Sequence, residues 1–368
     1  MKHRSAAVPL SLLVAAVVVY ASLYPFEGWR WPTGAWGAFL IAPWPRYWTG
    51  FDVAFNLLGY TPLGFLLCFA AMRSGSQTRS AVWLAVVLGS SLSLVLEFLQ
   101  NMLPGRVPSN VDWALNTAGA TLGATVAVAV FRLGGTARWQ SWRELWFVPS
   151  SSGGLTLLLL WPLALLFPLP VPLGVGQVAD RLIVALGEWV VGTPVEAWWK
   201  ASFADNLPVT PLPPATEFGV VVVGQLLPCL VLYAVSLPGW RRVVLALGAG
   251  ALGWTTTTLS TALNFGPEHA LTWFTHLTLM AFGLGTVLAV LLSWVSSRAA
   301  AALGLMVATL LVVWVNKAPP DPYFSQSLAA WEQGRFVQFH GAAQWVGWLW
   351  PYAAMLHLWM MAVGRFKR

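Results

Sequence analysis

Charged residues are scarce in this chain of 368 residues: Asp, Glu, Lys and Arg make up 9% of it, against roughly 25% in a typical soluble domain. Apolar residues make up 58%. Apolar runs of about 20 residues, long enough to cross the hydrocarbon core of a bilayer, recur along the chain. The 24 tryptophans suit such an environment, because their amphipathic rings favour the membrane–water interface. The composition therefore predicts an all-α, polytopic helical membrane protein.

The sequence lacks the residue patterns that several kinds of functional site require. The chain has only two cysteines, Cys68 and Cys229, and both lie inside apolar runs, which is typical of buried side chains rather than of a disulfide or a metal site. The histidines share no metal-ligand spacing, and no Gly-rich phosphate loop or nucleophile elbow is present. The net charge of +7 comes from small basic clusters between apolar runs, a pattern that does not favour nucleic-acid binding.

Ten apolar segments are predicted to cross the membrane. They are residues 5–24, 51–72, 80–101, 111–132, 152–174, 217–237, 242–262, 271–296, 299–317 and 341–363. If the amino terminus lies inside, most of the 20 Lys and Arg residues fall in cytoplasmic segments, where Glu144 is the only acid. This alternation predicts a multi-pass protein of the bacterial inner membrane with both termini in the cytoplasm. The first segment is expected to be retained, although a cleaved signal peptide is the alternative.

Three connections on the predicted outer side are unusual. Residues 27–50 are rich in Trp and Pro, which suits a segment lying in the membrane interface. Residues 176–216 contain apolar side chains spaced for an interfacial helix, and residues 318–340 form the third long connection. We expect the last two to be lids or surface helices.

The two halves of the chain resemble one another. Asp52 and Gly59 match Glu217 and Gly224, and Trp113 and Gly123 match Trp273 and Gly283. The pattern predicts a four-helix unit at 1–135, a diverged parallel copy at 150–298 and two additional helices at 299–368. Chance similarity between apolar segments is the alternative. Because Asn56 is replaced by Val221 and Asp112 by Thr272 in the second half, the first half is expected to hold the working site.

Polar side chains gather at the predicted outer ends of the second, third and fourth helices. The candidates are Asp52, Asn56, Glu97, Gln100, Arg106, Asp112 and Asn116. The spacings of three or four place Asp52 with Asn56, Glu97 with Gln100, and Asp112 with Asn116, each pair on one helix face. A carboxylate at the centre of a membrane helix costs about 2.5–3.5 kcal/mol, so such groups are placed near partners or water. We therefore predict one polar site at one membrane face.

The chemistry of this site has several interpretations. In the simplest, Arg106 bridges Glu97 and Asp112, the amides link the helices, and nothing binds. Three acids near one Arg leave excess negative charge, however, and oxygen ligands suit a divalent cation such as Mg²⁺ or Ca²⁺. The same oxygens suit sugar hydroxyls, or general acid–base catalysis by Glu97 or Asp112. The sequence leaves these alternatives open.

The order and spacing of these residues resemble those of the VanZ-like family of bacterial membrane proteins. The resemblance covers residues 10–133 and rests on the Asp52–Asn56 pair, Pro62–Gly64, the Glu97–Gln100 pair, Arg106, and the Asp112–Asn116 pair followed by Gly119 and Gly123. It implies a four-helix membrane frame, a role at the cell envelope related to antibiotic resistance, and these polar residues as the site.

Together these features predict a non-enzymatic envelope protein that binds the polar head group of a lipid, such as a glycolipid or a polyprenyl-linked precursor. The first alternative is a membrane-embedded hydrolase or transferase that acts on such a precursor with Glu97 or Asp112 as the base. The second is a transporter, which the repeat favours but the missing charges of the second half do not.

Overall fold

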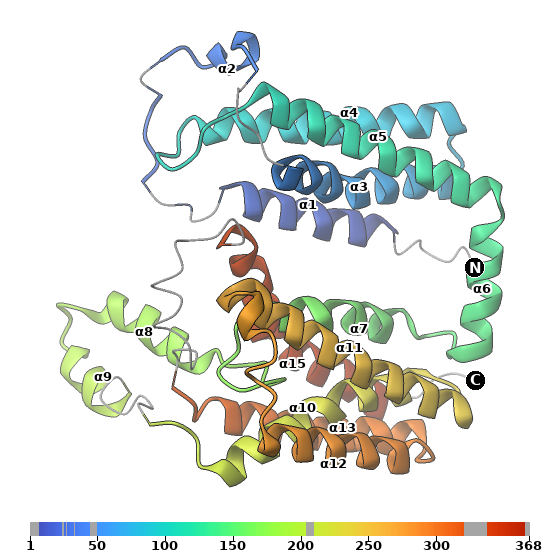
Figure 1. Ribbon diagram of the computed structural model, residues 1–368, viewed down its shortest axis with the longest axis vertical. Helices are drawn as coiled ribbons and strands as arrows, with labels where there is room; N and C mark the ends of the chain where they lie inside the picture. Colours follow the sequence, from blue (N-terminus) through green and yellow to red (C-terminus); the bar gives the residue numbers. More distant parts are fainter. Residues whose placement is uncertain are drawn as a thin grey trace. The chain divides into compact units, whose positions relative to one another are not determined.

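Figure 1 shows the computed structural model, which is mostly helical in the residues that it describes. The described residues are 7–23, 26, 28–32, 34–44, 50–203, 210–319 and 337–364. Within these ranges, only the backbone is described for Pro9, Phe51, Asp52, Thr136 and residues 337–342. The chain divides into two compact units, Met1–Trp142 and Arg143–Arg368. The described part contains fourteen α-helices and one isolated β-bridge, between Phe147 and Ser236.

Unit 1 is a bundle of four apolar helices. The helices that begin in it are α1 (Ala7–Leu23), α2 (Ala38–Ile41), α3 (Gly50–Arg73), α4 (Thr78–Gln100), α5 (Asn110–Arg132) and α6 (Gly135–Trp146). In Figure 1, α1, α3, α4 and α5 run side by side, and α3 packs against each of the other three. The short α2 is followed by Ala42 in an extended conformation, and its Phe39 packs edge-on against Phe98 of α4.

Glycines bring α3 and α5 unusually close together. A Cβ atom at Gly119 would overlap the carbonyl oxygen of Leu57, one at Gly123 that of Thr61, and one at Gly64 that of Ala120. Small residues at such spacing allow membrane helices to pack backbone against backbone. This contact fixes the register of α3 against α5, and so decides which polar residues at their ends face each other.

Unit 2 is built around a buried helix. Its helices are α7 (Ser152–Leu165), α8 (Ala179–Val190), α9 (Glu196–Ser202), α10 (Pro214–Val235), α11 (Trp240–Phe265), α12 (His276–Leu292), α13 (Ser297–Val315) and α15 (Val337–Val363), with a 3₁₀ turn at Pro267–His269. Residues 220–235 of α10 are all buried, because α7, α11, α12, α13 and α15 all pack against it. A helix that is apolar on every face fits such a central position.

The segment after α7 corrects the sequence prediction. A single helix was expected over residues 152–174, but α7 ends at Leu165 and residues 166–178 are irregular and largely buried. Pro168, Pro170 and Pro172 alternate through this stretch, and each lacks a backbone donor and restricts the residue before it to extended conformations. These prolines explain why the helix stops. The last membrane segment of the predicted repeat is also shorter than expected, since α12 begins at His276 instead of residue 271.

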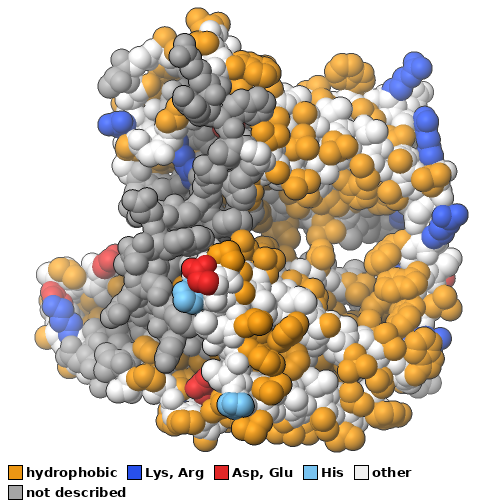
Figure 2. Space-filling view, viewed as in Figure 1, with side chains coloured by type: hydrophobic (Ala, Val, Ile, Leu, Met, Phe, Trp, Pro, Cys, Tyr) orange, Lys and Arg blue, Asp and Glu red, His pale blue; other side chains and the backbone are white. Residues whose placement is uncertain are grey.

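Seven helices are long and apolar enough to cross a membrane: Val53–Arg73, Thr78–Gln100, Asn110–Arg132, Pro214–Val235, Trp240–Phe265, Ser297–Val315 and Ala343–Val363. Three shorter apolar helices, Leu10–Leu23, Ser152–Leu165 and His276–Leu292, coincide with the other three predicted spans. Figure 2 shows hydrophobic side chains exposed across the described surface in this view, with few charged ones between them. The chain is thus a polytopic helical membrane protein, as predicted; the crossing of all ten segments stays a prediction.

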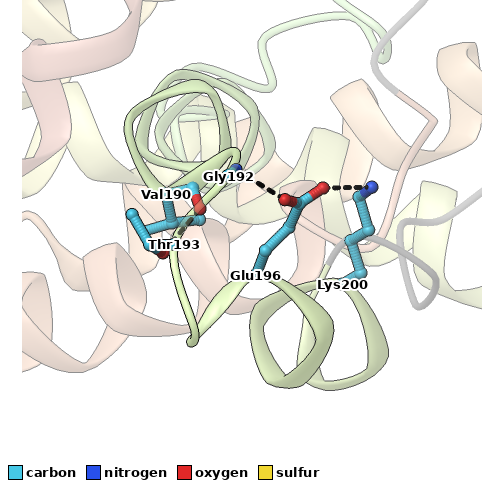
Figure 3. Close-up of polar contacts among 5 residues, drawn as sticks. All are labelled: Val190, Gly192, Thr193, Glu196 and Lys200. Atoms are coloured by element: carbon cyan, nitrogen blue, oxygen red, sulfur yellow. Dashed lines mark hydrogen bonds and ion pairs between the residues drawn. The ribbon is translucent and has the colours of Figure 1, made fainter.

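The interfacial helix expected within residues 176–216 is a pair, α8 and α9, which pack on each other. The turn between them is held by Glu196, which accepts hydrogen bonds from Gly192 N at 2.6 Å and Lys200 Nζ at 2.7 Å (Figure 3). These bonds hold the pKa of Glu196 below its ordinary value, the lysine bond most strongly. Large apolar side chains such as Trp189 and Trp198 are exposed on the pair. Most of the third connection, residues 320–336, lies outside the described residues.

The helix contacts of the two units correspond under the predicted repeat. In unit 1, α1 packs on α3 and α4, α3 packs on α4 and α5, and α4 packs on α5. In unit 2, helices α7, α10, α11 and α12 correspond to α1, α3, α4 and α5. The same five pairs of helices pack against each other there as well. Gly285 rather than Gly283 lies closely against α10. The repeat stays a prediction, and these contacts support it.

Candidate functional site

The candidate site is built at the ends of α3, α4 and α5, which meet at one end of unit 1. Asn56, in the second turn of α3, donates from Nδ2 to Asp112 Oδ1, in the first turn of α5, at 2.8 Å. The close packing of Gly119 on Leu57, one residue further along α3, holds these two helices in register. Both polar side chains are half-buried, so the pair lies at the edge of the bundle. Asp52 lies one turn before Asn56 in α3, and its side chain is outside the described set.

Glu97 lies deepest in the cluster, with 3% of its surface exposed. Its Oε2 accepts a hydrogen bond of 2.8 Å from the backbone N–H of Ser109. Ser109 is in turn the N-cap of α5, where its hydroxyl accepts from the N–H groups of Val111 and Asp112. Glu97 and Asp112 are close enough to repel one another electrostatically, and Tyr60 of α3 is buried beside Glu97. Two carboxylates thus lie near the amino end of α5, which favours negative charge.

Asn116 lies one turn below Asp112 and links α5 to α4. Its Nδ2 donates to Ser93 Oγ at 2.9 Å, whereas its buried Oδ1 accepts no hydrogen bond from any described residue. Ser90 of α4 accepts hydrogen bonds from the indole of Trp113 and the hydroxyl of Thr117. The sequence prediction missed these serines. Their spacing of three and four residues toward Glu97, on one face of α4, could have identified them.

Gln100 and Arg106 contact the carboxyl end of α1. Gln100 Nε2 donates to the carbonyl oxygen of Ser22 at 3.1 Å, and Arg106 Nη2 donates to that of Ala21 at 3.2 Å. The last carbonyls of a helix lack intrahelical partners, and a positive charge is favourable there. Partial burial lowers the pKa of the Arg106 guanidinium from its ordinary value. At least part of the hydrogen-bonding capacity of these two residues therefore serves to hold α1 in unit 1.

A Trp-rich segment, within residues 28–44, is bonded to this end of the bundle. Backbone Arg30 N donates to Met102 O, Asn101 Nδ2 donates to Trp36 O, and Asn110 Nδ2 donates to Ala42 O. These bonds tie the Trp-rich segment to the loop that carries Arg106. Within this segment, Trp31 is 74% exposed, Ile41 is 90% exposed and Trp44 is 63% exposed. Exposed indoles beside a polar loop are typical of the membrane–water interface.

Comparison with known families agrees with this arrangement. Residues 7–132 match the family model described as VanZ/LLP1. Residues 7–132 are a VanZ/LLP1 domain. No curated protein and no solved structure matches the chain. The resemblance predicted over residues 10–133 is confirmed, and the VanZ/LLP1 domain comprises all of α1, α3, α4 and α5.

The polar end of the VanZ/LLP1 domain is rich in hydrogen-bond acceptors. Asp112 is half-buried and within reach of the surface, whereas Glu97 is enclosed and already bonded to the α5 cap. Among the side chains that the structure describes, no three His, Cys, Asp or Glu residues come together as a metal site, and Asp52 lies outside that set. The described part of the site is therefore suited to accepting hydrogen bonds from a ligand.

Proposed function

We propose that the VanZ/LLP1 domain binds the polar head group of a membrane lipid at the carboxylate and amide cluster, on the outer face of a bacterial inner membrane. The observation that carries the proposal is that hydrogen bonds tie the loop between α4 and α5, at the same end of unit 1 as the cluster, to the exposed, Trp-rich segment. Asn101 and Asn110, which flank the polar loop, bond to Trp36 and Ala42 of that segment. Because indoles favour the level of the lipid head groups, the cluster would lie beside them.

The chemistry of the cluster indicates the class of head group. Asp112, the Oδ1 atom of Asn116 and Glu97 are acceptors, and Asn116 Oδ1 has no donor among the described residues. Of these, Asp112 is half-buried and can accept from the hydroxyl donors of a ligand, since carboxylates form strong, charge-assisted hydrogen bonds with them, whereas Glu97 and Asn116 are buried. A sugar head group of a glycolipid or of a polyprenyl-linked precursor has this chemistry. An anionic phosphate head group without a sugar would be repelled by the carboxylates.

Native mass spectrometry of the purified full-length protein tests the proposal. The probe is diglucosyldiacylglycerol, with diacylglycerol, which lacks the sugars, as the matched control lipid. We expect the wild-type protein to retain the glycolipid in preference to diacylglycerol, and Asp112→Asn to lose that preference. Glu217→Gln is the control variant, because it removes an acid at the start of α10 in unit 2. Equal retention of both lipids by the wild-type protein, or an unchanged preference in Asp112→Asn, would refute head-group binding.

The enzyme alternative gives a different result in the same samples. A hydrolase or transferase that uses Asp112 or Glu97 as its base would convert the added glycolipid to a product of different mass, and Glu97→Gln or Asp112→Asn would abolish this conversion. The burial of Glu97 and its bond to Ser109 N favour a structural role for that residue. We therefore expect Glu97→Gln to destabilise unit 1, and Asp112→Asn to affect binding at normal protein levels.

A further inference from the structure

The chain leaves the helical conformation after α7, and we call this irregular segment, residues 166–178, the α7 break. Leu166, the C-cap of α7, accepts hydrogen bonds through its carbonyl oxygen from Ser260 Oγ at 2.9 Å and Asn264 Nδ2 at 3.1 Å, both from α11. At the other end of the segment, Gly176 O accepts from Asn316 Nδ2 and Tyr352 Oη. Non-helical backbone at membrane depth is tolerated where protein groups or water satisfy it. The break is thus supported by polar side chains from three neighbouring helices.

Beside this break, three buried polar side chains have unused hydrogen-bonding capacity. Gln225 of α10 is 0% exposed and Trp161 of α7 is 1% exposed. Both amide atoms of Gln225, the indole N–H of Trp161 and the hydroxyl of buried Thr257 in α11 form no hydrogen bond with any described residue. Buried polar atoms are almost always paired, with protein or with ordered water. Four such atoms in one region therefore require an explanation.

Trp161 and Gln225 meet at Gly253 of α11. A Cβ atom placed at Gly253 would lie 3.4 Å from Trp161 Cζ2 and 3.5 Å from Gln225 Oε1, so both face the same point. Thr257 lies one turn further along the face of α11 that carries Gly253. A Cβ at Gly250 would lie 3.1 Å from Gln225 Nε2. The glycines of α11 allow polar groups of α7 and α10 to approach its backbone.

The residues around this point define what could occupy it. The three side chains are neutral, and together they supply indole, amide and hydroxyl donors as well as amide and hydroxyl acceptors. The surroundings are tight, because a Cβ at Gly253 would lie 2.7 Å from Trp161 Cη2. An occupant must therefore be small and uncharged, and must both donate and accept hydrogen bonds.

We propose that unit 2 holds a water-binding site beside the α7 break, formed by Trp161, Gln225 and Thr257 within the helical bundle. Buried water in proteins typically forms about three hydrogen bonds to polar groups that otherwise lack partners. Water beside these side chains would supply the partners that the indole N–H, the amide and the hydroxyl lack among the described residues.

The predicted repeat relates this site to the polar cluster of the VanZ/LLP1 domain. Gln225 follows Gly224 as Tyr60 follows Gly59, and Glu97 falls opposite Ser260 or Thr261, one turn beyond Thr257 in α11. Tyr60 and Ser93 lie beside Glu97 in unit 1. The second half would then keep a polar position at the same level of its bundle and lose the carboxylate, which matches the neutral chemistry of the proposed site.

Radiolytic hydroxyl labelling tests the proposal, because radicals formed from bound water oxidise side chains next to that water even where bulk solvent has no access. The matched control is Trp350, which is 2% exposed and whose Nε1 donates to Leu157 O at 2.7 Å. In the intact, purified wild-type protein we expect Trp161 to be oxidised several times faster than Trp350. Equal, slow oxidation of the two tryptophans would overturn the proposal, and would indicate that small side-chain rotations pair Trp161 directly with Gln225.

Two variants identify the groups that hold the water. Gln225→Leu and Thr257→Val keep approximately the side-chain volume and remove the polar atoms, so each is expected to slow the oxidation of Trp161 toward the rate of Trp350. Thermal melting of each variant checks that unit 2 is folded. Unchanged oxidation of Trp161 in folded Gln225→Leu and Thr257→Val would exclude these residues as the site. The wild-type comparison stands even if a variant fails to fold, and its result is independent of lipid binding by the VanZ/LLP1 domain.

Discussion

Asn56 and Asp112 face each other across the α3–α5 contact, with Asn56 Nδ2 2.8 Å from Asp112 Oδ1. A double-mutant cycle of Asn56→Ala and Asp112→Ala should reveal a coupling of about 1 kcal/mol, within the range measured for hydrogen bonds between membrane helices. The measurement is reversible unfolding of the detergent-solubilised protein. Additive effects, within about 0.3 kcal/mol, would contradict a direct bond.

The approach of α3 to α5 predicts unequal effects of two glycine substitutions in the same helix. A Cβ at Gly64 would overlap the backbone of Ala120, whereas a Cβ at Gly59 has nothing within 4 Å. Gly64→Ala should therefore destabilise the protein by about 1–3 kcal/mol, as overpacking does, and Gly59→Ala should be neutral or slightly stabilising. Thermal melting, monitored by size-exclusion chromatography, compares the two variants. Equal melting temperatures for the two variants would show that the glycine contact does not hold these helices.

The fold class and most of the helices could be predicted because apolar runs and their polar interruptions are local features of the sequence. The cluster could be located in the same way: Asn56 and Asp112 each begin an apolar run, and the VanZ-like spacing relates them. The structure brings these two side chains into direct contact. The head-group ligand and the orientation in the membrane remain predictions.

Most of the features that the sequence did not show are contacts between residues that lie far apart in the chain. Gln100 and Arg106 bond to carbonyl groups of α1, about 80 residues earlier in the chain, and no spacing rule predicts a partner at such separation. The irregular segment after α7 is different, since the alternating Pro168, Pro170 and Pro172 were visible and point to a helix end. Arg242 begins the apolar segment predicted at residues 242–262, and the sequence did not show that its side chain is buried, with 1% of its surface exposed.

Arg242 holds together three helix ends in unit 2. Its guanidinium donates to the carbonyl oxygens of Tyr233 and Ser236 at the end of α10, and to those of Ser293 and Val295 after α12. It also donates to Ser297 Oγ at the start of α13. Its positive charge is favourable at the carboxyl ends of α10 and α12, where the helix dipoles are negative.

Replacing Arg242 should therefore lower the free energy of unfolding by more than the replacement of an exposed arginine. Arg242→Met would leave several buried carbonyl groups without donors, and we expect a loss of about 3 kcal/mol or more. Arg242→Lys should recover part of this loss, because lysine keeps the charge but not the planar, multiple donors. Arg298→Met is the matched control, since Arg298 is exposed in the first turn of α13. An unfolding free energy for Arg242→Met equal to that of the control would refute the role of Arg242.

Asp180 and Glu196, in the helix pair α8 and α9, should give stability changes of opposite sign with pH. Asp180 is 4% exposed and its Oδ2 bonds to no described residue. Burial raises its pKa above the ordinary value, although Arg181 opposes the shift. The pKa of Glu196 lies below its ordinary value, chiefly because of the bond to Lys200. A raised carboxyl pKa means that the folded state binds more protons than the unfolded state, and a lowered pKa means the reverse.

The protein should therefore lose stability from Asp180 as the pH rises through its elevated pKa, and from Glu196 as the pH falls through its depressed pKa. Asp180→Asn removes the first effect, so its melting temperature relative to wild type should increase from pH 4 to pH 8. Glu196→Gln removes the second, so its relative melting temperature should decrease over the same range. Thermal melting in one buffer series measures both variants. If the two differences move in the same direction, the proposed causes of these pKa shifts are wrong, because a general effect of pH on the protein cancels in each difference.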